Sequence, residues 1–359
     1  MIHGDVTVIA ARPQVAGLPV SLPPRPQLLA GRDELLAGLD ARLTGGDAPR
    51  PRVVALHGLG GAGKTSVAVE YAHRHLAEVG LAWQFPAEDP ALLLADFGRL
   101  AAELGTREVV DARDPVASVH AVLAAQTASW LLVFDNVLDE GAVRRFLPPA
   151  GRGRVLITSQ SAVWRRDWAV EVRVLGPEVA AGFLVSQTGD PDSQAATALA
   201  AELGGLPLAL EQAAAYIQTT GTTLAGYLAV FRHRRSALLA RGEVAGHPAD
   251  VAATLGLALS RLEAETPAAA EVLRLLACLA PEPVPLALLL ADPQAAGKLA
   301  PAIAATIGPL LDDPVAAGDA VAALRRYSLV TLAGDGQVLV HRLVQAITLG
   351  QLAADVAVQ

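Results

Sequence analysis

Cysteine, lysine and asparagine are almost absent from this sequence. The single Cys278 allows no internal disulfide, which fits a reducing cytoplasm, and its apolar surroundings predict a packed side chain. Lysine occurs only at Lys64 and Lys298, so a lysine in place of arginine suggests a specific need for a compact ammonium. Aromatic residues make up 4% of the chain, so leucine, valine and alanine must build the core.

The sequence also lacks the signals of membrane and nucleic-acid proteins. The amino terminus has no basic region followed by an apolar core, and no apolar run reaches roughly 18 residues without proline or charge. We therefore expect a soluble, cytoplasmic protein without a membrane partner. The net charge of −8 argues against a general nucleic-acid surface.

Against this background, the stretch GLGGAGKTS forms a complete G-x-x-x-x-G-K-[ST] phosphate-binding loop. It follows the apolar run VVALH and precedes SVAVEYAHRHL, which has helical periodicity, so the motif has its required strand–loop–helix context and an accidental glycine-rich turn is disfavoured. Its glycines let backbone N–H groups face phosphates, and its lysine supplies a point charge. The predicted nucleotide-binding residues of the loop are Gly58, Gly60, Gly61, Ala62, Gly63, Lys64, Thr65 and Ser66.

A second strand, WLLVFDNV, predicts which nucleotide base is bound and which residue would hold the metal ion. The only asparagine, Asn136, is followed by Val137, so the guanine-reading N-K-x-D motif cannot be built and ATP/ADP is favoured. Asp135 ends the strand where a carboxylate would hold Mg²⁺ together with Thr65, although an acid there could also cap a turn. Lys64 and Asp135 are thus the catalytic candidates.

Asn136 also bears on the rate of hydrolysis. Many ATPases carry a second carboxylate at this position, and an amide cannot accept a proton. Asp139 and Glu140 lie nearby, but we expect them to begin the next helix, where acids suit the helix dipole. The sequence therefore predicts slow ATP hydrolysis.

Strand and helix patterns alternate along the first half of the chain and then give way to helices. The predicted class is α/β, with a parallel sheet followed by a helical domain and a winged-helix domain. The expected strands are 53–57, 82–86, 130–134, 154–158 and 170–174, with helices at 63–78, 90–104, 115–128 and 139–146. The expected parts are 1–25 (leader or linker), 26–175 (P-loop nucleotide-binding domain), 176–250 (helical domain, with a connector at 241–250) and 251–359 (winged-helix domain, with a hairpin around Asp335 and Gly336).

Over roughly residues 25–355 the chain resembles the NB-ARC module of the STAND (NLR-like) P-loop ATPases, especially bacterial NB-ARC proteins with tetratricopeptide repeats. LLAGRDELL, GGLPLAL and LVHRLVQ match three further family motifs. The resemblance implies that Arg32 lies near the adenine, that Pro207 packs against the base, and that His341 reaches the β-phosphate of ADP. Taken alone, Arg32 and Pro207 could simply start helices, and His341 could be a structural hairpin residue.

The resemblance further implies an ADP-locked switch that self-associates after exchange for ATP, with sensor repeats and an effector outside this chain. One departure is Gln160, which stands where the family usually has an arginine that senses the γ-phosphate. The alternative is a winged-helix DNA-binding transcription regulator gated by ATP. A small-molecule kinase is a third class, but its arginine-rich lid is not visible.

Overall fold

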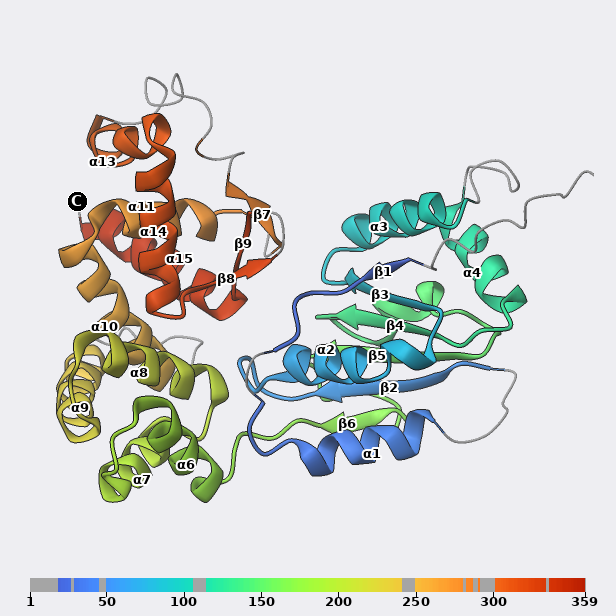
Figure 1. Ribbon diagram of the computed structural model, residues 1–359, viewed down its shortest axis with the longest axis horizontal. Coiled ribbons are helices and arrows are strands. Elements are labelled where there is room, and N and C mark those ends of the chain that lie inside the picture. The colour runs from blue at the N-terminus through green and yellow to red at the C-terminus, as the bar shows by residue number, and fades with distance from the viewer. Residues whose placement is uncertain are drawn as a thin grey trace, which may run out of the picture.

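The computed structural model describes residues 19–26, 29–44, 50–105, 114–240, 249–279, 282–286, 290, 301–333 and 336–358. Its elements form two groups that lie side by side, an α/β part built on one large sheet and a part made of helices with a small sheet (Figure 1). The predicted fold class is confirmed. No helix within the described ranges is long and apolar enough to cross a membrane.

The large sheet has six parallel strands in the order β1-β3-β4-β5-β2-β6. They are β1 (Val20–Ser21), β2 (Arg52–His57), β3 (Leu81–Pro86), β4 (Trp130–Asp135), β5 (Gly153–Ser159) and β6 (Ala169–Glu171). β1 differs from the expectation of a leader over 1–25, because Val20 and Ser21 pair with Ala82 and Trp83 at the sheet edge. A two-residue strand is too short to produce an alternating pattern that a sequence would reveal.

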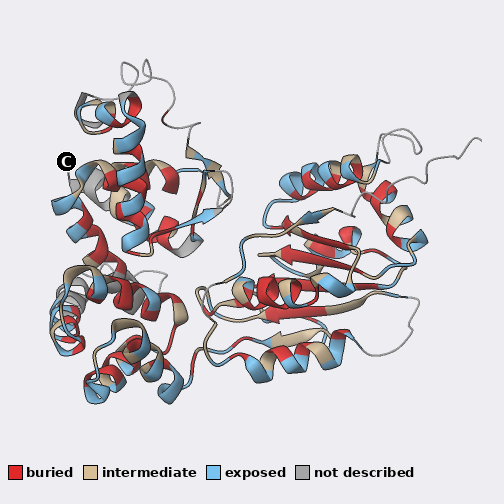
Figure 2. Ribbon diagram, viewed as in Figure 1, coloured by how far each residue is buried: buried red, intermediate tan, exposed pale blue. Residues whose placement is uncertain are grey.

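Helices cover both faces of this sheet, so successive residues of its central strands enter different cores (Figure 2). Leu131 and Val133 of β4 pack into one core, whereas Leu132 and Phe134 pack into the other. The helices of this part are α1 (Asp33–Leu43), α2 (Lys64–Arg74), α3 (Pro90–Glu103), α4 (Pro115–Ala125) and α5 (Glu140–Val143), with 3₁₀ turns at Leu76–Glu78 and Arg144–Phe146. Burial on both faces explains why the sequences of these strands are continuous apolar runs.

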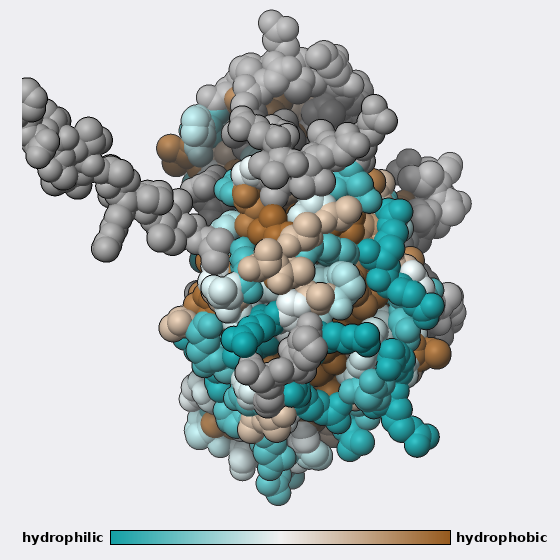
Figure 3. All heavy atoms as spheres, turned by 90° about the vertical axis from the view of Figure 1, so that its right-hand side faces the viewer, coloured by the Kyte–Doolittle hydropathy of each residue, from teal (hydrophilic) through white to brown (hydrophobic). Residues whose placement is uncertain are grey.

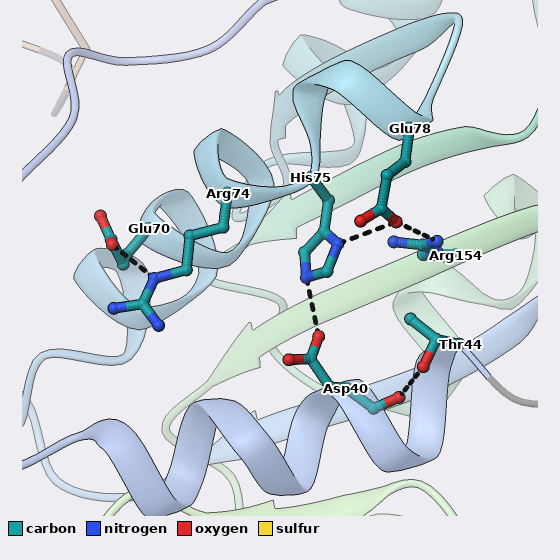
Figure 4. Close-up of polar contacts among 7 residues, drawn as sticks. All are labelled: Asp40, Thr44, Glu70, Arg74, His75, Glu78 and Arg154. Atoms are coloured by element: carbon teal, nitrogen blue, oxygen red, sulfur yellow. Dashed lines mark hydrogen bonds and ion pairs between the residues drawn. The ribbon is translucent and has the colours of Figure 1, made fainter.

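A polar network lies at the amino ends of the strands, and the surface that Figure 3 shows from this end of the molecule mixes hydrophilic and hydrophobic side chains. His75, at the end of α2, has Nε2 2.7 Å from Oδ1 of Asp40 and Nδ1 3.0 Å from Oε2 of Glu78 (Figure 4). Arg154 at the start of β5 donates to the same Glu78 oxygen at 2.8 Å. The network ties the end of α2 to α1 and β5.

The second part begins with five helices: α6 (Pro177–Thr188), α7 (Ser193–Glu202), α8 (Pro207–Thr220), α9 (Leu224–Ala240) and α10 (Ala249–Glu265). α10 packs against α8 and α9, and also against the helix that follows it. Residues 241–248 of the expected connector lie outside the described residues.

The remaining elements have the helix–strand–helix–helix–hairpin order of a winged helix. They are α11 (Pro267–Ala277), β7 (Val284–Pro285), α13 (Pro301–Asp312), α14 (Pro314–Arg326), β8 (Val330–Ala333), β9 (Gln337–Val340) and α15 (Arg342–Val358). The three strands are antiparallel in the order β7-β9-β8. Gly336 of the predicted turn has φ 72°, while Asp335 lies outside the described residues. The expectation that Cys278 packs in the core is wrong, because its side chain is exposed. Cys278 is the C-cap residue of α11, just beyond the apolar face of that helix.

The segment before α1 is clamped to α2. The guanidinium of Arg25 donates from Nε and Nη2 to the two carboxylate oxygens of Glu70, both at 2.8 Å, and Arg74 Nε donates to Glu70 at 2.7 Å. His73 adds a 2.8 Å contact to the carbonyl of Pro23. The hydrogen bonds from Arg25, and then from Arg74, hold the pKa of Glu70 at about 2 against the effect of its burial.

We expect Glu70→Gln to lower the melting temperature at pH 7. Because the folded-state pKa of Glu70 is about 2 and its ordinary value is 4.5, its stabilisation is complete above that ordinary value. The difference between wild type and variant should narrow as pH falls from about 5 toward 2, as thermal unfolding at several pH values would measure. Glu171→Gln, which breaks an exposed pair with Arg173, is the matched control. Equal effects of the two variants would contradict the clamp.

Candidate functional site

The phosphate loop connects β2 to α2 at the carboxyl edge of the large sheet. Its backbone depends on glycine, because Gly58, Gly61 and Gly63 have φ values of 146°, 78° and 89°. A β-carbon on Gly58 would also lie 2.5 Å from the carbonyl oxygen of Val172. Only glycine therefore fits this turn without displacing the neighbouring chain.

Lys64 is buried within the loop. Its Nζ donates to the carbonyl oxygens of Gly58 at 3.0 Å and Leu59 at 2.8 Å. Burial lowers the pKa of Lys64, and the charge of Asp135 opposes that shift. An ammonium held in this way is positioned to bind an anion in the loop.

Thr65 and Asp135, the two residues predicted to hold a metal, are in direct contact. Thr65 Oγ1 donates to Asp135 Oδ1 at 2.7 Å. Burial raises the pKa of Asp135, although hydrogen bonds from Thr158 and Thr65 and the charge of Lys64 favour the carboxylate. A hydroxyl and a carboxylate are the hard oxygen donors that Mg²⁺ prefers, so this pair fits the cation. The described residues contain no group of three or more His, Cys, Asp or Glu side chains that could hold a metal.

Thr158 is a site residue that the sequence analysis missed. Its Oγ1 donates to Asp135 Oδ1 at 2.6 Å and accepts from the backbone N–H of Asn136 at 2.8 Å. The side chain is 1% exposed. A polar residue near the end of β5, the strand next to β4, is the signal that could have identified it. Thr158 thus orients the carboxylate and fixes the backbone that follows it.

Arg32 supports the phosphate loop from outside. Its Nη2 donates to the carbonyl oxygen of Ala62 at 2.9 Å, and its burial lowers the pKa of the guanidinium. Gly31 has φ 61° and lies against α6, where a β-carbon would come within 2.8 Å of Val179 Cγ1. The observed contact of Arg32 is with the loop backbone, and its placement near an adenine stays a prediction.

Pro207 occupies the first turn of α8, which abuts the phosphate loop. The N–H of Leu208 donates to the carbonyl oxygen of Gly61 at 3.3 Å, and a β-carbon on Gly61 would be 3.1 Å from Leu208 Cβ. Further along α8, Gln212 Nε2 donates to the carbonyl of Ser328 at 3.1 Å. α8 therefore bridges the loop and the segment that precedes β8.

His341, between β9 and α15, lies within electrostatic reach of Lys64. The side chain is accessible to solvent, yet its pKa falls to about 4 because the surrounding protein desolvates the imidazolium, and the Lys64 ammonium adds repulsion. The structure thus brings a residue from the winged-helix elements toward the lysine of the phosphate loop, although 277 positions separate them.

The residues that the sequence analysis linked to the rate of hydrolysis lie at the same edge of the sheet. Gln160 follows β5, and a β-carbon on Gly60 would be 3.8 Å from its Oε1. Asp139 caps α5 by accepting from the N–H of Ala142 at 2.9 Å, and Glu140 pairs with Arg144 at 3.1 Å. The expectation that Asp139 and Glu140 begin a helix is confirmed.

Comparisons with known proteins agree with this architecture. No protein-family model matches the chain. It is 32% identical over 246 residues to the Regulatory protein AfsR of Streptomyces coelicolor, covering 62% of this chain and 23% of that protein. It is 31% identical over 315 residues to the protein of the same name from Streptomyces griseus, covering 82% of this chain and 29% of that protein. The chain thus spans less than a third of these curated relatives.

The chain is also similar to a solved Signal Transduction ATPase with Numerous Domains (STAND) that has a tetratricopeptide repeat sensor, from Pyrococcus horikoshii. The TM-score is 0.54 at 15% identity, covering 91% of this chain and 43% of that one. The similarity supports the resemblance to STAND proteins at the level of the fold. The narrower resemblance to the NB-ARC module stays a prediction.

We expect Thr158→Val to weaken Mg²⁺-dependent binding of ATP. The valine keeps the shape of threonine but removes the hydroxyl that orients Asp135 and accepts from Asn136, which should also cost roughly 1–3 kcal/mol in the free energy of unfolding. Titrating Mg²⁺ against a fluorescent ATP analogue measures the first effect. Thr197→Val is the control, since Thr197 is exposed and bonds only to its own helix. An unchanged Mg²⁺ dependence would contradict the assigned role of Thr158.

Proposed function

We propose that this protein is an ATP/ADP-binding molecular switch of the STAND type, with an ADP-locked resting state and slow ATP hydrolysis. The observation that carries the proposal is the geometry of the phosphate loop, where Lys64 Nζ is held by the carbonyls of Gly58 and Leu59 and Thr65 Oγ1 donates to Asp135. His341 comes from a different part of the fold, and the charge of Lys64 helps to lower its pKa. The proposal divides the chain into nucleotide-binding (26–175), helical (176–250) and winged-helix (251–359) parts, and it assigns the switch to the cytoplasm.

The resting state follows from the charges at this junction. Lys64 and a protonated His341 repel each other, whereas a phosphate placed between them attracts both. In the proposed ADP complex, Lys64 and the loop N–H groups hold the phosphates, and Pro207 packs on the base. His341 binds the β-phosphate and so links the winged-helix part to the loop. Arg32 acts by supporting the loop backbone through its bond to Ala62.

The active state follows from loss of that link. When ATP replaces ADP, we expect Thr65 and Asp135 to hold Mg²⁺, which neutralises charge on the terminal phosphates. His341 then releases its contact, the winged-helix part moves, and the protein self-associates. Because the chain spans less than a third of its curated relatives, a sensor and an effector in the remainder of such a protein are part of the proposal.

Hydrolysis in this scheme resets the switch and is slow. Asn136 offers no carboxylate beside Asp135, and Gln160 offers no positive charge beside the loop. We expect a steady turnover below about one per second, near the low end for enzymes. A phosphate-release assay at saturating ATP would detect a faster reaction, which would contradict the slow cycle.

A second candidate is a DNA-binding regulator gated by ATP. Arg325 and Arg326 are exposed at the end of α14, the helix before the wing, and the two Streptomyces relatives are named regulatory proteins. Against it, Thr219 Oγ1 of α8 donates to the carbonyl of Arg326 at 3.0 Å, so α8 lies beside that helix end, and the net charge is −8. A salt-dependent gel shift with duplex DNA would favour this candidate.

We expect ADP binding to take up a proton at His341. Without nucleotide its pKa is about 4, so the imidazole is neutral at pH 6, and a bound β-phosphate would raise that pKa by favouring the charged form. Affinity for ADP should therefore increase as pH falls from about 7 toward 5. Calorimetric titrations in buffers of different ionisation enthalpy measure the uptake.

The His341→Gln variant is the control, because it keeps a hydrogen-bonding side chain but cannot be protonated. It should lose this uptake and release ADP faster, whereas Lys64→Ala should not bind nucleotide at all. Equal proton uptake by wild type and His341→Gln would contradict the link between His341 and phosphate.

A further inference from the structure

Helix α8 contacts both the phosphate loop and the winged-helix elements, through two hydrogen bonds one helical turn apart. In its first turn, the N–H of Leu208 donates to the carbonyl oxygen of Gly61. One turn later, Nε2 of Gln212 donates to the carbonyl oxygen of Ser328 at 3.1 Å. Ser328 follows the C-cap residue of α14, which packs beside α8 (Figure 1). α8 therefore touches both elements whose relative movement the proposed switch requires.

The backbone after α14 forms a Schellman turn that turns one carbonyl toward α8. Ser328 has φ 51°, in the left-handed region that glycine normally occupies after a helix. The N–H of Leu329 donates to the carbonyl oxygen of Leu324 at 3.0 Å, and the N–H of Ser328 donates to that of Arg325 at 2.9 Å. These bonds close the end of α14 and leave the Ser328 carbonyl oxygen outside the helix, where Gln212 bonds to it.

The other two residues of the turn 326–328 are also bonded to neighbouring helices. Thr219 Oγ1 of α8 donates to the carbonyl oxygen of Arg326 at 3.0 Å. The hydroxyl of Tyr327, a residue only 1% exposed, donates to Oε2 of Glu265 in α10 at 2.9 Å. Each of the three residues of this turn is therefore held by a side chain or an acid of α8 or α10.

The burial of Gln212 is explained by this contact better than by core packing. The residue is 1% exposed, and its Oε1 has no hydrogen-bond partner among the described residues. A buried amide oxygen without a partner is destabilising, so an apolar side chain of similar size would pack in this position at lower cost. The bond from Nε2 to the turn is what a glutamine provides here and a leucine does not.

We propose that Gln212 is a latch that keeps the turn 326–328, and with it the winged-helix elements, bonded to α8 in the closed, resting arrangement; the inference rests on the proposed nucleotide switch. When the winged-helix part moves away from α8 into the open arrangement, the bond between Gln212 and Ser328 breaks. Gln212 is thus a positioning residue. It biases the equilibrium between the two arrangements and is not one of the residues assigned to the nucleotide.

The ratio of the affinities for ADP and for a non-hydrolysable ATP analogue with Mg²⁺ tests the latch in the full chain. If ADP binds the closed arrangement and ATP the open one, this ratio follows their equilibrium, whichever arrangement dominates without nucleotide. Gln212→Leu keeps the approximate size of the side chain but removes the donor. We expect it to shift the ratio about fivefold toward ATP, which is the effect of one lost hydrogen bond on an equilibrium constant. Thr219→Val should shift the ratio in the same direction.

Gln218→Leu is the matched control. Gln218 lies on the same helix, and its Nε2 also donates to a backbone carbonyl, but that carbonyl belongs to Gln187 of α6 and not to the winged-helix turn. This variant should keep the wild-type ratio. A merely structural role of Gln212 would weaken the binding of both nucleotides alike, so the ratio separates the latch from a general loss of stability.

Each outcome decides between the latch and its alternatives. An unchanged ratio in both Gln212→Leu and Thr219→Val, or an equal shift in Gln218→Leu, overturns the latch but leaves the proposed switch intact. Where Gln212→Leu does not fold, Thr219→Val alone decides in the same way. Failure of the wild type to bind ADP or the ATP analogue rejects the proposed function itself.

Discussion

The placement of a buried Lys64 ammonium in the phosphate loop, near enough to His341 to help lower the pKa of its imidazole, is the constraint on which the proposed switch depends. Both groups are desolvated by surrounding protein, which lowers the pKa of each. In such an environment an anion placed between the two cations stabilises them more strongly than it would in water. We therefore propose that a bound phosphate stabilises the protonated form of His341 beside Lys64, whereas His341 is neutral at pH 6 without it.

The phosphate loop is also held from outside by segments that are distant in sequence. Arg32 donates to the carbonyl of Ala62, and Leu208 donates to that of Gly61. At the opposite end of α2, His75 ties the helix to α1 and β5. α2 begins at Lys64 and is held at both ends. A movement of α8 or α1 would therefore displace the phosphate loop.

Much of the sheet and part of the site could be predicted from the sequence. The central strands follow from apolar runs, and the contact between Thr65 and Asp135 follows from the order of the two motifs in a parallel sheet. β1 could not be predicted, since it joins the sheet mainly through its backbone. The role of Thr158 depends on how β5 pairs with β4, which tertiary packing sets. The roles predicted for Arg32, Pro207 and His341 at a bound nucleotide stay predictions.

The most direct test of the switch is the distance between its two parts with each nucleotide bound. Cys278 is the only cysteine and is exposed, and Asp167 is exposed on the α/β part, so a spin label on Cys278 and one on Asp167→Cys would report that distance. With ADP we predict one narrow distribution, and with Mg²⁺ and a non-hydrolysable ATP analogue a shift to longer distances. Identical distributions with the two nucleotides would contradict the account.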